Sequence, residues 1–236
     1  HEAEKEFAEL VGGQIYPGAR KKDVVDKQGN IHSVKSGEKK WQIFLYGRKR
    51  FKDSIGFPGA SLFMDCIDSF PEKREKYLRD KRRFKLNLQP RMRDLKDFLA
   101  GSNSSFLHSN KLIFLQEAIF HSSEVDYLAI KENNLFHIFD AEEVIRTIEA
   151  ATKVANSKAA QKDQMDDQKV IFKLSDRDIS IGEIEMRNDS EIHYRQVKFW
   201  MDREKTLDLL RKKINKEMRK SDRIVTYGKA TTRFKL

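Results

Sequence analysis

Cysteine is almost absent from this sequence of 236 residues, in which Cys66 is the single thiol. One thiol cannot form an internal disulfide or a CxxC zinc-binding pair, so a reducing compartment is expected. Cys66 lies in the apolar run LFMDCI and is predicted to be buried. No apolar run approaches the roughly 18 residues of a membrane-spanning helix, and no signal peptide is recognisable. We therefore expect a cytoplasmic protein without membrane contact.

Several catalytic motifs are also missing. The sequence contains no GxxxxGK[ST] phosphate loop, no GxGxxG dinucleotide turn, no HExxH zinc motif and no GxSxG nucleophile turn. These absences argue against nucleotide-driven motors, dehydrogenases, zinc proteases and α/β-hydrolases, and no nucleotide cofactor is expected. The chain begins His1-Glu2-Ala3 without Met, so we expect the natural protein to have further residues at its N-terminus.

Positive charge is what the sequence has in excess. It holds 47 Lys and Arg against 37 Asp and Glu, which gives a net charge of +10 spread along the chain. Such a distribution suits a folded domain that meets a polyanion, because each neutralised phosphate releases counterions. Many basic proteins bind no nucleic acid, so the charge is only a reason to look for a site. Over residues 72–96 eleven bases stand against four acids, which we interpret as a solvated helix face.

The order of elements predicts the fold class. With 39% apolar residues and 16 Phe the chain can bury a substantial core. Periodicity and turn residues predict helix, strands, helices, strands, helix and strands in succession, which is typical of a mixed α/β or α+β fold with a central mixed sheet flanked by helices. The predicted elements are a helix ending at Gly12-Gly13, a hairpin of KDVVD and IHSVK, a helix from Glu38, mostly helices over 57–121, strands at 125–131 and 135–139, a helix capped by Asp140, a loop at 162–169, strands in VIFKLSD, ISIGEIEMR and IHYRQVKFWM, and a helix from Arg203 to Lys220.

The first hairpin brings an acid and a lysine together. Side chains two apart on a strand point the same way, so Ser33 and Lys35 share one face, and Asp23 on the neighbouring strand joins them. Hydrolysis of a phosphodiester needs a divalent metal and a positive group against the developing charge. Mg²⁺ accepts one or two carboxylates and keeps several waters. The pattern therefore predicts a phosphodiester-cleaving site, or else an ordinary surface ion pair between Asp23 and Lys35.

This stretch resembles the core of the PD-(D/E)xK nuclease superfamily, in particular type II restriction endonucleases. The resemblance covers about 40 residues: the first helix, YPGARKKD, the hairpin, SVKSG and KKWQ. It implies a restriction-endonuclease-like core in which Asp23 and Glu4 hold Mg²⁺, Lys35 acts on the water or the transition state, and Ser33 and Gln42 complete the site. Gln42 would lie on a helix, and Glu2 and Glu6 are alternatives to Glu4.

The sequence departs from the family at Ser33, where a carboxylate usually stands. Uncharged polar residues do occur in this slot, and Glu4 or Asp26 are the candidates to compensate for the missing ligand. Asp26 is predicted to point to the opposite strand face from Asp23 and ranks lower. His32 also lies on the opposite face from Ser33, and we interpret it as a surface or core residue.

A second acidic cluster and a set of basic residues are further candidates for functional sites. Glu183, Glu185 and Arg187 alternate onto one strand face near Asp178, but an arginine is a poor substitute for a lysine that must orient or deprotonate water. A basic β-ribbon around His193 could instead contact DNA. The expected DNA-binding residues are Arg20, Lys21, Lys22, Lys39, Lys40, Arg187, Arg195 and Lys198.

Together these features predict a Mg²⁺-dependent endonuclease of the restriction type that cuts double-stranded DNA at a specific sequence. The resemblance implies a homodimer, since a palindromic site is most simply read by a two-fold protein. We expect one nuclease domain over 1–236, with 57–121 as a mainly helical insertion and 168–236 as a β-rich region for DNA contact or dimerisation. The alternatives are a DNA repair or junction-resolving nuclease and a non-enzymatic nucleic-acid-binding protein.

Overall fold

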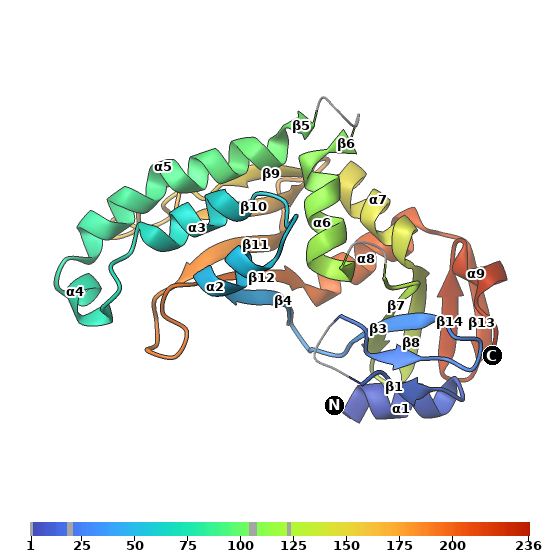
Figure 1. The fold of residues 1–236 in the computed structure, drawn as a ribbon. Coiled ribbons are helices and arrows are strands. Elements are labelled where there is room, and N and C mark those ends of the chain that lie inside the picture. Colours follow the sequence, from blue (N-terminus) through green and yellow to red (C-terminus); the bar gives the residue numbers. More distant parts are fainter. Residues whose placement is uncertain (1, 18–20, 104–107, 122–123) are drawn as a thin grey trace. The chain divides into compact units, whose positions relative to one another are not determined.

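The computed structural model describes residues 2–17, 21–103, 108–121 and 124–236. The chain divides into two compact units. Unit 1 comprises His1–Trp41, Leu115–Ala150 and Asp202–Leu236, and unit 2 comprises Gln42–Phe114 and Ala151–Met201. Each unit is built on one large sheet, of seven strands in unit 1 and five in unit 2, with helices beside it (Figure 1). The predicted α+β class with a central mixed sheet is therefore confirmed.

The sheet of unit 1 has the strand order β1-β2-β3-β7-β8-β14-β13. It is mixed, because β3 pairs in parallel with β7, and β8 with β14, whereas the other neighbours are antiparallel. The elements of this unit are α1 (Glu2–Leu10), β1 (Gln14–Ile15), β2 (Val24–Val25), β3 (Ile31–Lys35), β7 (Tyr127–Glu132), β8 (Leu135–Asp140), α7 (Ala141–Ala151), α8 (Arg203–Lys213), β13 (Glu217–Ser221), β14 (Ile224–Tyr227) and α9 (Ala230–Arg233).

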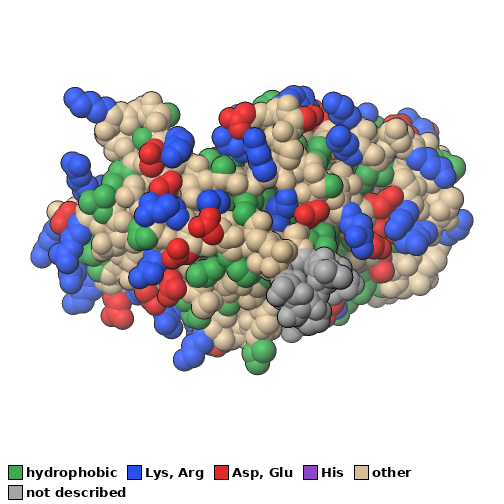
Figure 2. All heavy atoms as spheres, turned by 90° about the horizontal axis from the view of Figure 1, so that it is seen from above, with side chains coloured by type: hydrophobic (Ala, Val, Ile, Leu, Met, Phe, Trp, Pro, Cys, Tyr) green, Lys and Arg blue, Asp and Glu red, His purple; other side chains and the backbone are tan. Residues whose placement is uncertain are grey.

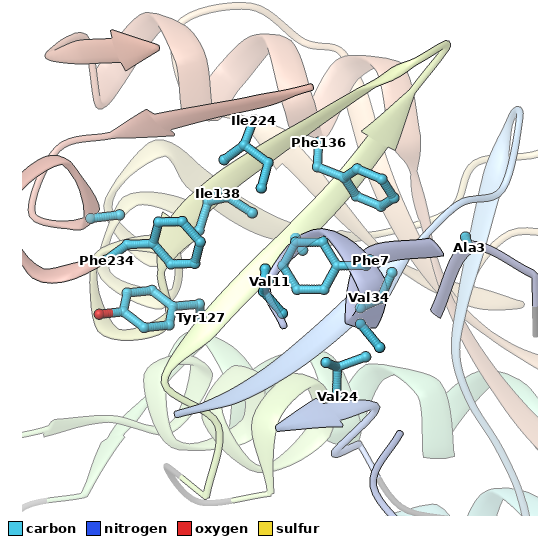
Figure 3. Packing of buried hydrophobic residues seen from close by; sticks show 13 residues of the cluster. Ala3, Phe7, Val11, Val24, Val34, Tyr127, Phe136, Ile138, Ile224 and Phe234 are labelled. Atoms are coloured by element: carbon cyan, nitrogen blue, oxygen red, sulfur yellow. The ribbon is translucent and has the colours of Figure 1, made fainter. Parts of the chain in front are cut away.

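Helix α1 covers one face of this sheet. Its buried Phe7, and Val11 directly after its last residue, pack among Val34 of β3, Phe136 of β8 and Phe234 (Figure 3). Full burial of such side chains stabilises the fold by about 1.5–3 kcal/mol each. Since side chains alternate along a strand, the neighbours of Val34 on β3 point to the opposite face.

The sheet of unit 2 has the strand order β4-β12-β11-β10-β9. Its core is rich in phenylalanine: Phe51 stacks on Phe63 with ring centroids 4.8 Å apart, and Phe114 contacts Phe199 at 5.3 Å. The elements of this unit are β4 (Lys40–Gly47, which starts in unit 1), α2 (Arg48–Asp53), α3 (Ala60–Asp68), α4 (Arg74–Arg79), α5 (Lys81–Ala100), β5 (Ser102–Asn103), β6 (His108–Ser109), β9 (Thr152–Asn156), β10 (Lys169–Leu174), β11 (Ser180–Arg187) and β12 (Gln196–Asp202). Helix α6 (Asn110–Phe120) belongs partly to each unit.

Most predicted elements are confirmed. The two strands β7 and β8 form the expected hairpin, and α7 begins where Asp140 Oδ1 accepts a hydrogen bond from the backbone N–H of Glu143 at 3.1 Å. None of the helices in the described part of the chain combines the length and apolar character that a bilayer crossing requires.

Two helix predictions are wrong in part. The helix expected from Glu38 is the strand β4, followed by the short helix α2. Trp41 and Ile43 are buried on either side of exposed Gln42, and this alternation is the pattern of a strand. The last long helix ends at Lys213 instead of Lys220, and Glu217–Ser221 forms β13.

Candidate nuclease site

Asp23, Ser33 and Lys35 converge on one side of the first hairpin. Lys35 Nζ lies 2.7 Å from Ser33 Oγ and 3.5 Å from Asp23 Oδ2. The Ser33 hydroxyl in turn donates to Asp23 Oδ2 at 3.2 Å. The three side chains thus form a closed triangle of contacts, in agreement with the face predicted from strand alternation.

The backbone of the hairpin fixes this acid. Asp23 precedes β2, and its N–H donates to the carbonyl of His32 at 2.9 Å, which continues the antiparallel pairing of β2 with β3. Its carboxylate turns toward β3 just before β2 begins, and its Oδ2 accepts the N–H of Val34 at 2.6 Å. The acid therefore satisfies a backbone donor on β3 and is oriented toward Ser33 and Lys35.

The triangle is largely shielded from solvent. The side chains of Asp23 and Lys35 are 15% and 17% exposed, and Ser33 is buried. The pair of Asp23 and Lys35 is therefore not an ordinary exposed surface ion pair. Burial strengthens the electrostatic interaction between charges, because the local dielectric constant is lower than in water.

The donor set can be tested for its fit to Mg²⁺. All the hydrogen bonds of the Asp23 carboxylate run to Oδ2, and Oδ1 has none to the part of the chain that the structure describes. One free carboxylate oxygen beside a hydroxyl suits a hard cation that keeps several of its waters. The residues therefore fit Mg²⁺, for which Asp23 would be the charged ligand.

A polar depression of about 480 Å³ lies in unit 1 where the chain leaves β3. Ser36, Gly37 and Glu38, which follow Lys35 in the sequence, line one part of it, and Glu2 and Arg203 line another. Arg203 donates to the carbonyl of Glu38 at 3.0 Å, so the wall is held in place by α8. Sequence reasoning missed this depression, because its wall is completed by Arg203, 165 residues beyond Glu38.

The helix acids lie on α1, which packs on the other face of β3. Glu4 is half-buried on this helix, whereas Ser33 and Lys35 point away from it. Glu6 is engaged by Arg223 and by Lys131, the latter at 2.5 Å. The predicted metal role of Glu4 stays a prediction, and the ion pairs of Glu6 make it a weaker candidate.

Gln42 does not lie on a helix. It is an exposed residue of β4, and it begins unit 2, whereas Asp23 and Lys35 belong to unit 1. The predicted helical position of this glutamine is therefore wrong, and the reason is that the chain continues from Lys40 as a strand.

Asp26 and His32 form a buried pair away from the triangle. Asp26 is 4% exposed and His32 is 0% exposed, and Asp26 Oδ2 lies 2.9 Å from His32 Nε2. His32 was expected to be either a surface or a core residue, and the structure places it in the core. Burial raises the pKa of Asp26, but hydrogen bonds from His32 and Asn30 outweigh it and bring the pKa down to about 2. Because this carboxylate is engaged within the turn, the structure does not offer it as the missing ligand.

The second acidic cluster is neutralised by a lysine. Lys169 Nζ lies 2.7 Å from Glu183 and 3.1 Å from Glu185, and Asp178 pairs with Lys173. Burial lowers the pKa of Lys169, but the hydrogen bonds and charges of Glu183 and Glu185 together outweigh this effect, and the pKa is raised. Within the described ranges no group of three or more His, Cys, Asp or Glu is arranged to hold a metal.

The predicted DNA-binding residues occupy varied surroundings. Arg20 lies outside the described residues. Lys22 pairs with Glu124 at 3.1 Å, and Arg195 pairs with Asp68 at 2.9 Å. Arg187 is paired with Asp189, and Lys198 faces Glu185 across the β11–β12 pairing. Lys21 is half-buried, and Lys39 and Lys40 are exposed. The arginines of the β-ribbon therefore have acidic partners already.

No protein-family model, no curated protein and no solved structure matches this chain. The site must therefore be judged from its own geometry.

Proposed function

We propose that this protein is a Mg²⁺-dependent endonuclease of the restriction type, which cleaves double-stranded DNA at a specific sequence. The observation that carries the proposal is the shielded triangle of Asp23, Ser33 and Lys35, with a lysine ammonium 2.7 Å from a hydroxyl and 3.5 Å from a carboxylate. The net charge of +10 suits a DNA substrate. A homodimer and a cytoplasmic location belong to the same proposal.

Each residue of the triangle has a distinct role in this proposal. Asp23 would hold Mg²⁺ through Oδ1, since Oδ2 is held by the Val34 N–H. The bound ion would polarise the scissile phosphate and lower the pKa of a water molecule. Ser33 positions Lys35 through the 2.7 Å contact. Lys35 donates to the attacking water or to the phosphate oxygens as their negative charge grows.

The decisive experiment compares Lys35→Ala with wild type on several plasmids, with and without Mg²⁺. Wild type should give discrete fragments only with Mg²⁺. Lys35→Ala should lower the cleavage rate by about 10²–10⁴-fold, the range for a lost proton-transfer or charge-stabilising group, and leave DNA binding measurable. Lys27→Ala is the matched control, because Lys27 is an exposed lysine in the turn of the same hairpin. Unchanged cleavage by Lys35→Ala would remove the assignment.

A non-enzymatic nucleic-acid-binding protein is the second candidate. The observation in its favour is that Asp23 caps the Val34 N–H, a structural task that needs no catalysis. DNA binding without Mg²⁺-dependent nicking across a range of DNAs would establish this candidate. Cleavage confined to branched or damaged DNA would instead indicate a repair or junction-resolving nuclease.

A further inference from the structure

Unit 2 contains a depression of about 330 Å³ lined mainly by cations. Lys81, Arg82 and Lys85 reach it from the first turns of α5, and Lys162 reaches it from the loop between β9 and β10. We call these four residues the basic notch. Asp163 is the one acid in its lining.

The loop that carries Lys162 is fastened to α5. Gln168 Nε2 donates to the carbonyl of Lys85 at 3.0 Å, and Gln89 Nε2 donates to the carbonyl of Asp166 at 2.9 Å. The helix and the loop therefore hold each other through backbone groups, so the fourth cation of the notch is kept beside the other three. This arrangement goes beyond the solvated helix face that the sequence indicated.

The notch carries an excess of positive charge, because one acid, Asp163, stands against its four cations. None of its four cations forms an ion pair within the described residues, whereas Lys169 and Arg195 of the same unit both do. Residues 81–93 hold six Lys or Arg and no acid. Lys81 and Lys85 are one helical turn apart, a spacing at which like charges repel. An anionic partner would remove this repulsion.

We propose that the basic notch binds the phosphate groups of duplex DNA and provides a sequence-independent contact of unit 2. Repeated phosphates are the polyanion that several clustered cations neutralise with release of counterions. A protein partner fits less well, because lysine is depleted at protein–protein interfaces. Figure 2 shows Lys and Arg side chains gathered at the left, the side on which α4 and the start of α5 lie in Figure 1. The proposal rests on the proposed function, in that DNA is the substrate.

The test is DNA binding without Mg²⁺, measured by fluorescence anisotropy on duplexes of unrelated sequence between 50 and 200 mM salt. The variant Lys81→Ala/Lys162→Ala removes one cation from each side of the notch. Two lost phosphate contacts should reduce the slope of log K against log salt by about 1.8, or about twelvefold in affinity over this fourfold salt range. Asp163→Asn removes the one acid of the notch and should therefore have the opposite effect, a tighter binding of DNA.

Lys212→Ala/Lys213→Ala is the matched control, because these lysines are exposed on α8 of unit 1 and the variant has the same net charge. It should change the slope less than the notch variant. An equal change in both variants, or none in the notch variant, would overturn the proposal, as would a wild-type protein that binds no DNA.

The two proposals fail separately. If the wild type never cleaves DNA but the notch variant binds DNA more weakly, the notch proposal stands and the nuclease proposal fails. If the wild type cleaves DNA and the notch variant binds DNA as tightly as the wild type, the nuclease proposal stands and the notch proposal fails. Circular dichroism checks that the variants are folded, which is expected since Lys81 and Lys162 are exposed.

Discussion

The buried pair of Asp26 and His32 gives a prediction whose size follows from the structure. The Asp26 carboxylate accepts hydrogen bonds from the backbone N–H groups of Gln28 and Asn30, from the Asn30 side-chain amide and from His32, each at 2.9 Å. These contacts close the turn between β2 and β3. We expect Asp26→Asn, which keeps the shape and removes the charge, to destabilise the protein.

The magnitude comes from the pKa of Asp26, which hydrogen bonds from His32 and Asn30 lower from 3.8 to about 2 in spite of burial. A shift of this size corresponds to about 2 kcal/mol of stability at pH 7. Because the folded-state pKa lies below the unfolded value, the contribution is fully present above about pH 4 and is lost as the pH falls through about 2. At pH 3 about half of it should remain.

The assay is urea unfolding of wild type and Asp26→Asn, followed by circular dichroism from pH 7 to pH 3. The difference in free energy of unfolding should shrink as the pH falls, whereas the effects of other carboxylates cancel in the comparison. Asp53→Asn is a control, because Asp53 is an exposed partner of Lys49 on α2. A difference that is absent at pH 7, or that stays constant down to pH 3, would refute the reasoning.

Two further predictions concern packing. Cys66 is fully buried, and burial raises the pKa of its thiol to about 12. An aromatic disulfide reagent at pH 8 should therefore modify it only after unfolding, and rapid modification of the folded protein would contradict the burial of this thiol. Gly13→Ala would place a methyl group 2.2 Å from the carbonyl oxygen of Val25, so the α1–β2 junction must shift. We expect a loss of about 1–3 kcal/mol in thermal or urea unfolding, and an unchanged midpoint would count against this close approach.

The first hairpin was predictable because its information is local. The alternation of IHSVK determines which side chains share a face, and the Gly29-Asn30 turn brings KDVVD beside it. The shared face of Ser33 and Lys35, two residues of the triangle, therefore follows from the two-residue period of a strand alone. The tilt of Asp23 onto the Val34 N–H does not follow, since it depends on β2 beginning only at Val24 and leaving that donor on β3 without a backbone partner in β2.

The strand β4 was missed because the information that determines it is not local. The run from Trp41 to Leu45 is apolar enough for either a helix or a strand, and short apolar runs do not distinguish the two. Its pairing with β12 is decided by residues about 155 positions later, which no local pattern reveals. The partition into two units, and with it the separation of Gln42 from Asp23, depends on the same long-range pairing.

The place of Ser33 in the triangle bears on the carboxylate that the family pattern expects there. Ser33 is buried and touches both Asp23 and Lys35, so a carboxylate at this position would stand beside Asp23 with only one lysine to offset two charges. Burying an unpaired charge is costly, and a hydroxyl avoids that cost while still bonding both neighbours. The serine is thus compatible with a site that has one charged ligand, and any second acid would have to reach the proposed metal from outside this shielded face.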